Sequence, residues 1–189
     1  MNKLAKNLIL LLSLIPLSSF SAGVSIEPMY GTERSARVYP EPITYKSKAF
    51  YGIRALYGVP LLSAELEVSQ SLSEDSFPVT GEKVKYNTQR AMIGIRTYPV
   101  ASKYVGFFFR TGARVQKDVR EVTDSAGLTT TIEDPISLDP YAGTGLTLAF
   151  ADAFALSAGA TLMYNRNAEA AEQYDTQFTL SFTLKTGNR

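Results

Sequence analysis

The sequence has 189 residues, a formal net charge of +1, and no cysteine, histidine or tryptophan. Without cysteine the chain can form neither a disulfide nor the lipid anchor of a lipoprotein. The near-neutral charge argues against a nucleic-acid-binding protein, which would carry a basic excess on one face. The absence of histidine removes Ser-His catalysis and imidazole-bound zinc.

The first 22 residues have the three parts of a secretory signal peptide. A short basic stretch with Lys3 and Lys6 precedes an apolar run, Leu8 to Leu17, and small residues follow from Ser18 to Ala22. A transmembrane anchor is the alternative, but a helix needs roughly 20 apolar residues to span a bilayer, and this run is shorter and contains Pro16. We therefore predict cleavage between Ser21 and Gly23, which changes the net charge from +1 to −1.

The remaining residues, 23–189, suit one domain and show the two-residue period of β-strands. The clearest example is the hairpin from Thr88 to Gln116, where aliphatic and aromatic residues alternate with arginine, glycine and glutamine. Eight strands are predicted in all, at residues 24–31, 47–58, 61–71, 88–97, 104–116, 136–150, 154–164 and 173–184. In the first of them, Pro28 cannot donate to a ladder, so we expect a bulge or local irregularity there.

The predicted connections alternate strictly between long and short. Long polar connections are expected at 32–46, 72–85, 117–135 and 165–172, and tight turns at 58–60, 98–103 and 151–153. In an up-and-down meander, every second connection lies at the same end, so one rim carries all the long loops. Transmembrane barrels show this asymmetry. The predicted fold is an all-β, eight-stranded antiparallel up-and-down transmembrane β-barrel.

Alternation alone does not say which face points outward, and a soluble periplasmic barrel of the lipocalin type would reverse the two faces. Three features favour the membrane. The polar face is poor in lysine and rich in glycine, serine, threonine and arginine, as a narrow lumen requires. Tyrosine and phenylalanine gather near the ends of the apolar faces, where interfacial girdles would place them. The secretory signal leads towards the outer membrane.

The whole of residues 23–189 resembles the small eight-stranded outer-membrane barrels, the group that includes outer membrane proteins A (its barrel domain), X and W. The segment Tyr174 to Leu184 is similar to the C-terminal assembly signal of these proteins, although Lys185 to Arg189 follow it. The resemblance implies a Gram-negative outer-membrane location, contact with outer-membrane lipids, insertion by the barrel-assembly machinery through the last strand, and a monomeric state.

Nine charged residues are predicted to face the lumen: Arg54, Glu65, Glu67, Arg90, Arg96, Arg110, Arg114, Asp139 and Asp175. Folding the hairpins about their turns places Arg54 opposite Glu65, Glu65 near Arg90, and Arg114 near Asp139. Because unpaired charges in so confined a space are costly, we predict an arginine–glutamate network that plugs the lumen. An ion or solute path lined by the same charges is the alternative.

These features predict a structural or surface-interaction protein whose long loops, 32–46, 72–85 and 117–135, meet the exterior. The alternative is a narrow channel, or a carrier of small hydrophobic compounds as the resemblance to outer membrane protein W would allow. We expect no enzymatic activity, cofactor or metal. The acidic pairs Glu74-Asp75 and Glu133-Asp134, and the segment Glu121 to Asp124, lack the spacing of a known calcium loop.

Overall fold

The protein folds into a closed β-barrel. A computed structural model describes residues 23–37, 44–59, 61–77, 81–165 and 173–186, so the predicted signal peptide lies outside the described residues. Its strands are β1 (Gly23–Arg37), β2 (Thr44–Val59), β3 (Leu62–Phe77), β4 (Glu82–Ala101), β5 (Val105–Thr123), β6 (Thr129–Glu133), β7 (Ser137–Ala149), β8 (Phe154–Tyr164) and β9 (Tyr174–Thr186). No helix in the described ranges is long and apolar enough to cross a membrane.

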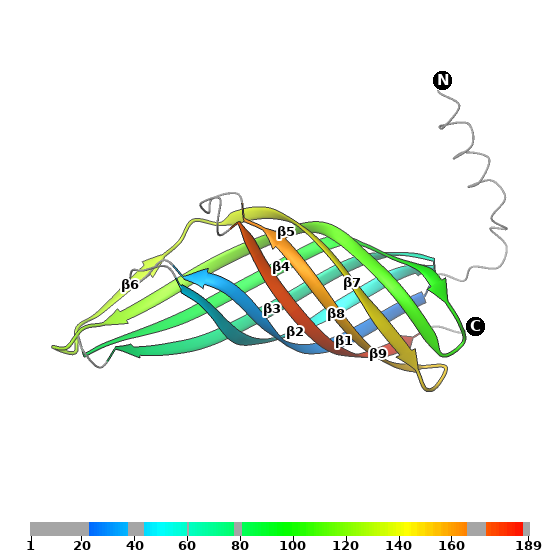
Figure 1. The fold of residues 1–189 in the computed structure, drawn as a ribbon, viewed down its shortest axis with the longest axis horizontal. Helices are drawn as coiled ribbons and strands as arrows, with labels where there is room; N and C mark the ends of the chain where they lie inside the picture. Colours follow the sequence, from blue (N-terminus) through cyan, green and yellow to red (C-terminus); the bar gives the residue numbers. More distant parts are fainter. Residues whose placement is uncertain (1–22, 38–43, 60, 78–80, 166–172, 187–189) are drawn as a thin grey trace, which may run out of the picture.

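Eight of these strands form the ring, and each pairs antiparallel with its neighbours (Figure 1). The pairing of β1 with β9 closes it. The ninth strand, β6, pairs with the outer end of β5 at Val119–Thr123, while β7 pairs with β5 over Val105–Gln116. Thus β6 and β7 occupy the same place in the ring, beside β5, and residues 134–136 separate them. The predicted eight-stranded antiparallel barrel is confirmed, with this interruption as an addition.

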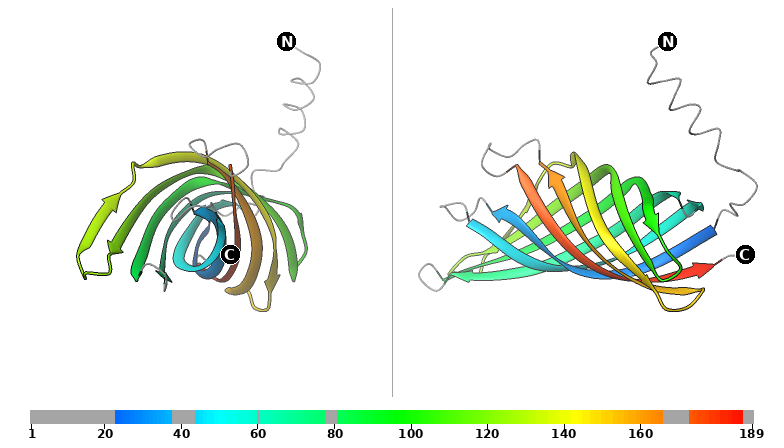
Figure 2. Two further views of the ribbon diagram at one scale, coloured as in Figure 1. Left: turned by 60° about the vertical axis from the view of Figure 1, so that its left-hand side comes forward. Right: turned by 45° about the vertical axis from the view of Figure 1, so that its right-hand side comes forward.

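Three of the four predicted long loops, 32–46, 72–85 and 117–135, are too long, because the strands continue into them, whereas the fourth, 165–172, lies almost entirely outside the described residues. β1 extends to Arg37, β3 to Phe77 and β5 to Thr123, and each return strand starts well before its predicted start. The extensions were missed because their exposed face carries lysine, glutamate and threonine, so it lacks the apolar signal of the lipid-facing segments. Figure 2 shows the extended ends of β3, β4, β5 and β6 as a curved sheet that projects beyond the shorter strands.

Of two local expectations, one is confirmed and one needs correction. Pro28 is the site of a local irregularity, because the pairing of β1 with β9 is missing at Glu27 and Pro28, but the register is the same before and after it, so there is no bulge. The turn predicted at 98–103 is shorter, because β4 continues to Ala101 after a register shift between Thr97 and Val100. A strand can therefore bend at this point without ending.

The two faces are those that the alternation predicts. The outward face of the ring is apolar, with Ile93 65% exposed, Val68 58% and Phe178 59%. The inward face buries the charged and hydroxyl side chains, including all five predicted arginines. A soluble barrel would bury its apolar face instead, so this orientation is that of a barrel in lipid.

We expect a lysine on the apolar outer face to destabilise the barrel strongly. Ile93→Lys should lower the free energy of unfolding by about 2–4 kcal/mol, because the ammonium group would lie among acyl chains near the middle of the bilayer. The measurement is urea unfolding of protein refolded into phospholipid vesicles.

Gln89→Lys is the matched control. Gln89 also faces outward on β4, but it lies in the part of the strand whose outer face is polar. We expect a change of less than about 1 kcal/mol there. Equal effects at the two positions would contradict the assignment of the outer face to lipid.

Candidate functional site

The lumen holds a neutral cluster of three carboxylates and three guanidinium groups. It consists of Glu27 from β1, Arg54 from β2, Glu65 and Glu67 from β3, Arg96 from β4 and Arg110 from β5. Each of these side chains is at most 4% exposed. Equal numbers of opposite charges are necessary here, because an uncompensated charge in so dry a space would be strongly destabilising.

Each carboxylate in this cluster contacts at least two guanidinium groups. Glu27 lies 3.0 Å from Arg54 and 3.1 Å from Arg96. Glu67 lies 2.7 Å from Arg54 and 2.8 Å from Arg110. Glu65 lies 2.9 Å from Arg96 and 2.6 Å from Arg110. The cluster therefore ties five consecutive strands of the ring together through the lumen.

Aromatic rings pack against this cluster. The Arg96 guanidinium lies 4.5 Å from the centre of the Phe108 ring, and Arg110 lies 4.9 Å from that of Tyr141. The hydroxyl of Tyr141 also donates a hydrogen bond to Glu65, at 3.2 Å. The Phe108 ring is seated against β7 and β8, where a β-carbon on Gly145 would collide with it. Glycine is thus required at position 145 by close packing.

An apolar layer lies beside this cluster. Met92, Tyr141 and Met163 come from β4, β7 and β8 and form a buried group, with the two methionines at most 1% exposed. Methionine side chains adapt to irregular gaps, so they fill the lumen between polar groups of fixed geometry. This layer and the cluster together fill part of the lumen.

A second group of ion pairs lies closer to the extended ends of the strands. Glu33 lies 2.5 Å from Arg90 and 3.7 Å from Lys48, and it accepts a hydrogen bond from Gln177 at 3.0 Å. Separately, Arg114 lies 2.9 Å from Asp139 and 3.2 Å from Asp175. The lumen is therefore filled by paired charges along much of its length.

All nine charged residues predicted to face the lumen lie inside the barrel. The Arg114–Asp139 pair forms as predicted, since the two residues are direct cross-strand partners. The Glu65–Arg90 pair is wrong: Arg90 binds Glu33, and Glu65 binds Arg96 and Arg110. The partner opposite Arg54 is Glu67 rather than Glu65, which lies two residues away, although Glu65 still approaches Arg54 to 3.8 Å.

Sequence reasoning missed two carboxylates, Glu27 and Glu33. Both lie on the inward parity of β1, together with Met29 and Gly31, so the alternation contained the signal. Glu27 is next to Pro28, where an irregularity was expected, and Glu33 lies in a stretch predicted to be a loop. Continuing the two-residue alternation of β1 past Pro28 to Glu33 would have placed both glutamates in the lumen.

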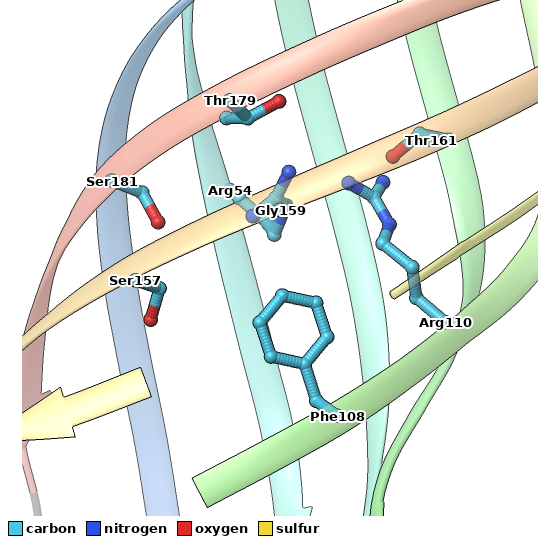
Figure 3. Close-up of a pocket in the computed structure, with 8 residues that line it drawn as sticks. All are labelled: Arg54, Phe108, Arg110, Ser157, Gly159, Thr161, Thr179 and Ser181. Atoms are coloured by element: carbon cyan, nitrogen blue, oxygen red, sulfur yellow. The ribbon is translucent and has the colours of Figure 1, made fainter. Parts of the chain in front are cut away.

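A small cavity remains between the charged cluster and the wall made by β8 and β9 (Figure 3). It measures about 10 Å³ and is lined by Arg54, Phe108, Arg110, Ser157, Gly159, Thr161, Thr179 and Ser181. This is about the space that one water molecule requires. Within the described ranges, no group of three or more histidine, cysteine, aspartate or glutamate side chains is arranged to hold a metal ion.

Solved structures share this architecture at low sequence identity. Ail of Yersinia pestis aligns with a TM-score of 0.58 at 12% identity, over 88% of this chain and 99% of that one. Neisserial surface protein A aligns with a TM-score of 0.55 at 15% identity, over 88% and 99%. Outer membrane protein OprG of Pseudomonas aeruginosa aligns with a TM-score of 0.55 at 9% identity, over 89% and 98%.

The chain has the fold of the small outer-membrane β-barrels. No protein-family model and no curated protein matches it. At identities of 9–15% the likeness establishes the fold of the barrel and carries no function across to it.

The ion-pair cluster predicts a specific pattern of double-mutant effects. Glu65→Gln should lower the free energy of unfolding by about 3–5 kcal/mol, because three buried guanidinium groups would then face two carboxylates. Adding Arg96→Met restores neutrality and should recover part of that loss. The measurement is the urea unfolding midpoint of the refolded barrel in detergent micelles.

Arg90→Met is the control partner, since Arg90 contacts Glu33 and not Glu65. Combined with Glu65→Gln, it should add its own destabilisation with little coupling. Recovery by Arg90→Met equal to that by Arg96→Met would refute the pairing described above.

Proposed function

We propose that the protein is an integral barrel of the Gram-negative outer membrane with a closed lumen, and that it acts through the sheet projecting beyond its outer rim. The observation that carries this proposal is the combination of a lumen filled by paired charges with a strand edge on β6 that no described strand covers. The long connections of such barrels face the exterior, so the projecting sheet would be presented at the cell surface.

The β6 edge is suited to binding an extended peptide. The backbone amide of Asp124 donates to the carbonyl of Leu128, and that of Asp134 donates to the carbonyl of Asp118. These two hydrogen bonds determine which residues of β6 bond to β5 and which do not. The alternation of an antiparallel ladder then directs the backbone groups of Thr129, Thr131 and Glu133 away from β5. All five residues of β6 are exposed, and its sequence, Thr-Thr-Thr-Ile-Glu, favours strands and contains none of the lysines or prolines that commonly block edges.

The charge of the projecting sheet indicates the chemistry of its partner. Over residues 72–77, 82–89 and 117–134 it carries four basic and eight acidic side chains, a net charge of −4. Ail was crystallised with a heparin analogue, sucrose octasulfate, which is a polyanion. The acidic sheet of the present barrel instead favours a basic, extended polypeptide that adds a strand to β6.

A narrow channel is the second candidate function. The small residues of β8 and β9 around the cavity favour it, because glycine and hydroxyl groups there line open space inside the lumen. The apolar layer of Met92, Tyr141 and Met163 and the ion pairs on either side of the lumen oppose it.

We expect the refolded barrel to give no steady conductance in planar bilayers, since paired charges and methionine side chains fill the lumen. Heat-modifiable migration on a gel would show that the same preparation is folded. A reproducible single-channel conductance that changes on Arg110→Lys would instead support the channel.

If a peptide binds through the backbone of β6, removing one backbone amide from this strand should weaken its binding. Barrel reconstituted in vesicles should capture a short peptide of alternating lysine and threonine, and Thr131→Pro should weaken capture about tenfold or more. Proline removes an outward amide and blocks further pairing, whereas the ladder to β5 is kept. Capture can be measured by fluorescence anisotropy of the labelled peptide.

Thr131→Ala is the control, because it removes the side chain and keeps the amide. It should bind the peptide nearly as well as the wild type. Equal weakening by both substitutions, or preferential capture of heparin, would count against strand addition by a basic partner.

A further inference from the structure

The projecting sheet has two faces of different chemistry, which continue the two faces of the barrel (Figure 2). Side chains of β4, β5 and β6 that share the parity of the lumen side chains form its inner face. On this face Val84 of β4 lies opposite Val122 of β5. Ile132 of β6 lies opposite Arg120 of β5. The inner face therefore carries an apolar side chain on each of these three strands.

The exposure of these apolar side chains increases towards the edge of the sheet. Val84 is fully buried, Val122 is half-buried, and Ile132 is 41% exposed. The charged neighbours of Ile132 already neutralise each other, since Arg120 lies 2.6 Å from Asp134. A strand added to β6 would therefore cover an apolar side chain on the inner face, and not an uncompensated charge.

The outer face at the same edge is polar. β6 presents Thr129, Thr131 and Glu133 on it, and all three are exposed. Glu133 pairs with Lys117 at 2.8 Å, yet 60% of its side chain remains exposed. Residues directly opposite each other in an antiparallel pair have β-carbons about 4.5–5.5 Å apart, so a basic side chain opposite Glu133 would reach its carboxylate.

A strand added to this edge must follow the alternation of β6. β6 has five residues, and the backbone groups of Thr129, Thr131 and Glu133 point away from β5. Residues of the added strand opposite these three share the outer face, and residues opposite Thr130 and Ile132 share the inner face. A shift of one residue would exchange the two sets of side chains between the faces.

We propose that the partner of β6 is an amphipathic strand, in which basic side chains on the outer face alternate with apolar side chains on the inner face. The apolar residues pack against Ile132, and a basic residue pairs with Glu133. This inference rests on the proposed function. It narrows the partner from a basic extended polypeptide to one that alternates lysine or arginine with β-branched or aromatic residues.

The first experiment compares two labelled peptides of equal length, a Lys-Val repeat and a Lys-Thr repeat. Valine and threonine have nearly the same shape and both favour strands, so the comparison reports the apolar contact. Barrel in phosphatidylcholine vesicles should bind the Lys-Val peptide about tenfold more tightly, because two valines on the inner face would be removed from water. Fluorescence anisotropy with empty vesicles gives the binding of each peptide to lipid alone.

Ile132→Thr tests whether this side chain causes the preference. The substitution keeps a β-branched residue in the strand and removes most of the apolar contact. It should reduce the preference for Lys-Val to about twofold or less and leave the affinity for Lys-Thr nearly unchanged. Ile136→Thr is the matched control and should keep the full preference, because Ile136 is 68% exposed but lies between β6 and β7, outside the edge strand.

Glu133→Gln tests the basic positions of the partner. It should weaken both peptides about threefold and keep their ratio, because the peptides share the lysines that would pair with this partly exposed carboxylate. Glu74→Gln makes the same change on the outer face of β3, at the other side of the projecting sheet. It should alter neither affinity.

Equal affinity of the wild type for the two peptides, or an undiminished preference in Ile132→Thr, would overturn the amphipathic strand and leave the binding of a basic peptide intact. If Glu74→Gln weakens binding as much as Glu133→Gln, the pairing at Glu133 is refuted. Failure of the wild type to bind either peptide, in a preparation whose heat-modifiable migration shows a folded barrel, would overturn the proposed function together with this inference.

Discussion

The structure depends on the narrowness of an eight-stranded barrel. Its interior is only wide enough for side chains, so a charge that points inward cannot keep a water shell and must find an opposite charge. The chain meets this requirement with glutamates on β1 and β3 and arginines on β2, β4 and β5. Because each carboxylate contacts guanidinium groups from different strands, the ion pairs fix the relative positions of strands that are not neighbours in the ring, such as β1 and β4 through Glu27 and Arg96.

The same narrowness explains why the two halves of the lumen differ. Long arginine side chains and the Phe108 ring extend inward from β2, β4 and β5 and fill the space on their side. Around the Phe108 ring the inward residues of β7, β8 and β9 are correspondingly small, with Gly145, Ser157, Gly159 and Ser181 as examples, whereas Tyr141 and Met163 are the large inward residues of β7 and β8. Large residues on both sides would overfill the lumen and force strain. Large side chains from one side of the lumen therefore pack against small ones from the other. The cavity is the space that this packing leaves unfilled.

At the pairing of β1 with β9, which closes the barrel, a side chain compensates for a local defect in the backbone ladder. Pro28 has no amide, and the β1–β9 pairing is missing at Glu27 and Pro28. At this point Glu27 accepts a hydrogen bond of 2.9 Å from the Thr183 hydroxyl and one of 3.5 Å from Ser181, both on β9. The two strands stay connected through the lumen where the ladder is interrupted. This contact makes Glu27 a member of both the seam and the charged cluster.

Which faces are lipid-facing and which line the lumen could be predicted from the sequence, because side-chain direction follows the two-residue period and needs no knowledge of the turns. Pairing could not be predicted with the same accuracy. Arg54 lies opposite Glu67 because the β2–β3 turn is short, and a register error of two residues keeps every face correct while changing the partner. The extended strands were missed for a different reason: beyond the apolar belt the outward face is polar, so Lys83 and Lys85 carry no apolar signal, although Val84 between them is buried.

The lumen and the projecting sheet are joined by one chain of hydrogen bonds. Arg90 contacts Glu33 and donates to Gln116 at 3.0 Å, Gln116 donates to Asp118 at 2.5 Å, and Thr88 also donates to Asp118. Lys48, on β2, donates to Thr88 at 2.9 Å, so this series of hydrogen bonds also includes β2. These contacts hold the bases of the extended strands β4 and β5 against β1 and β2, at the level where the barrel leaves the apolar belt. The direction of the projecting sheet is thus set by the same ion pairs that fill the barrel, so its edge is presented from a fixed base and not from a separate loop.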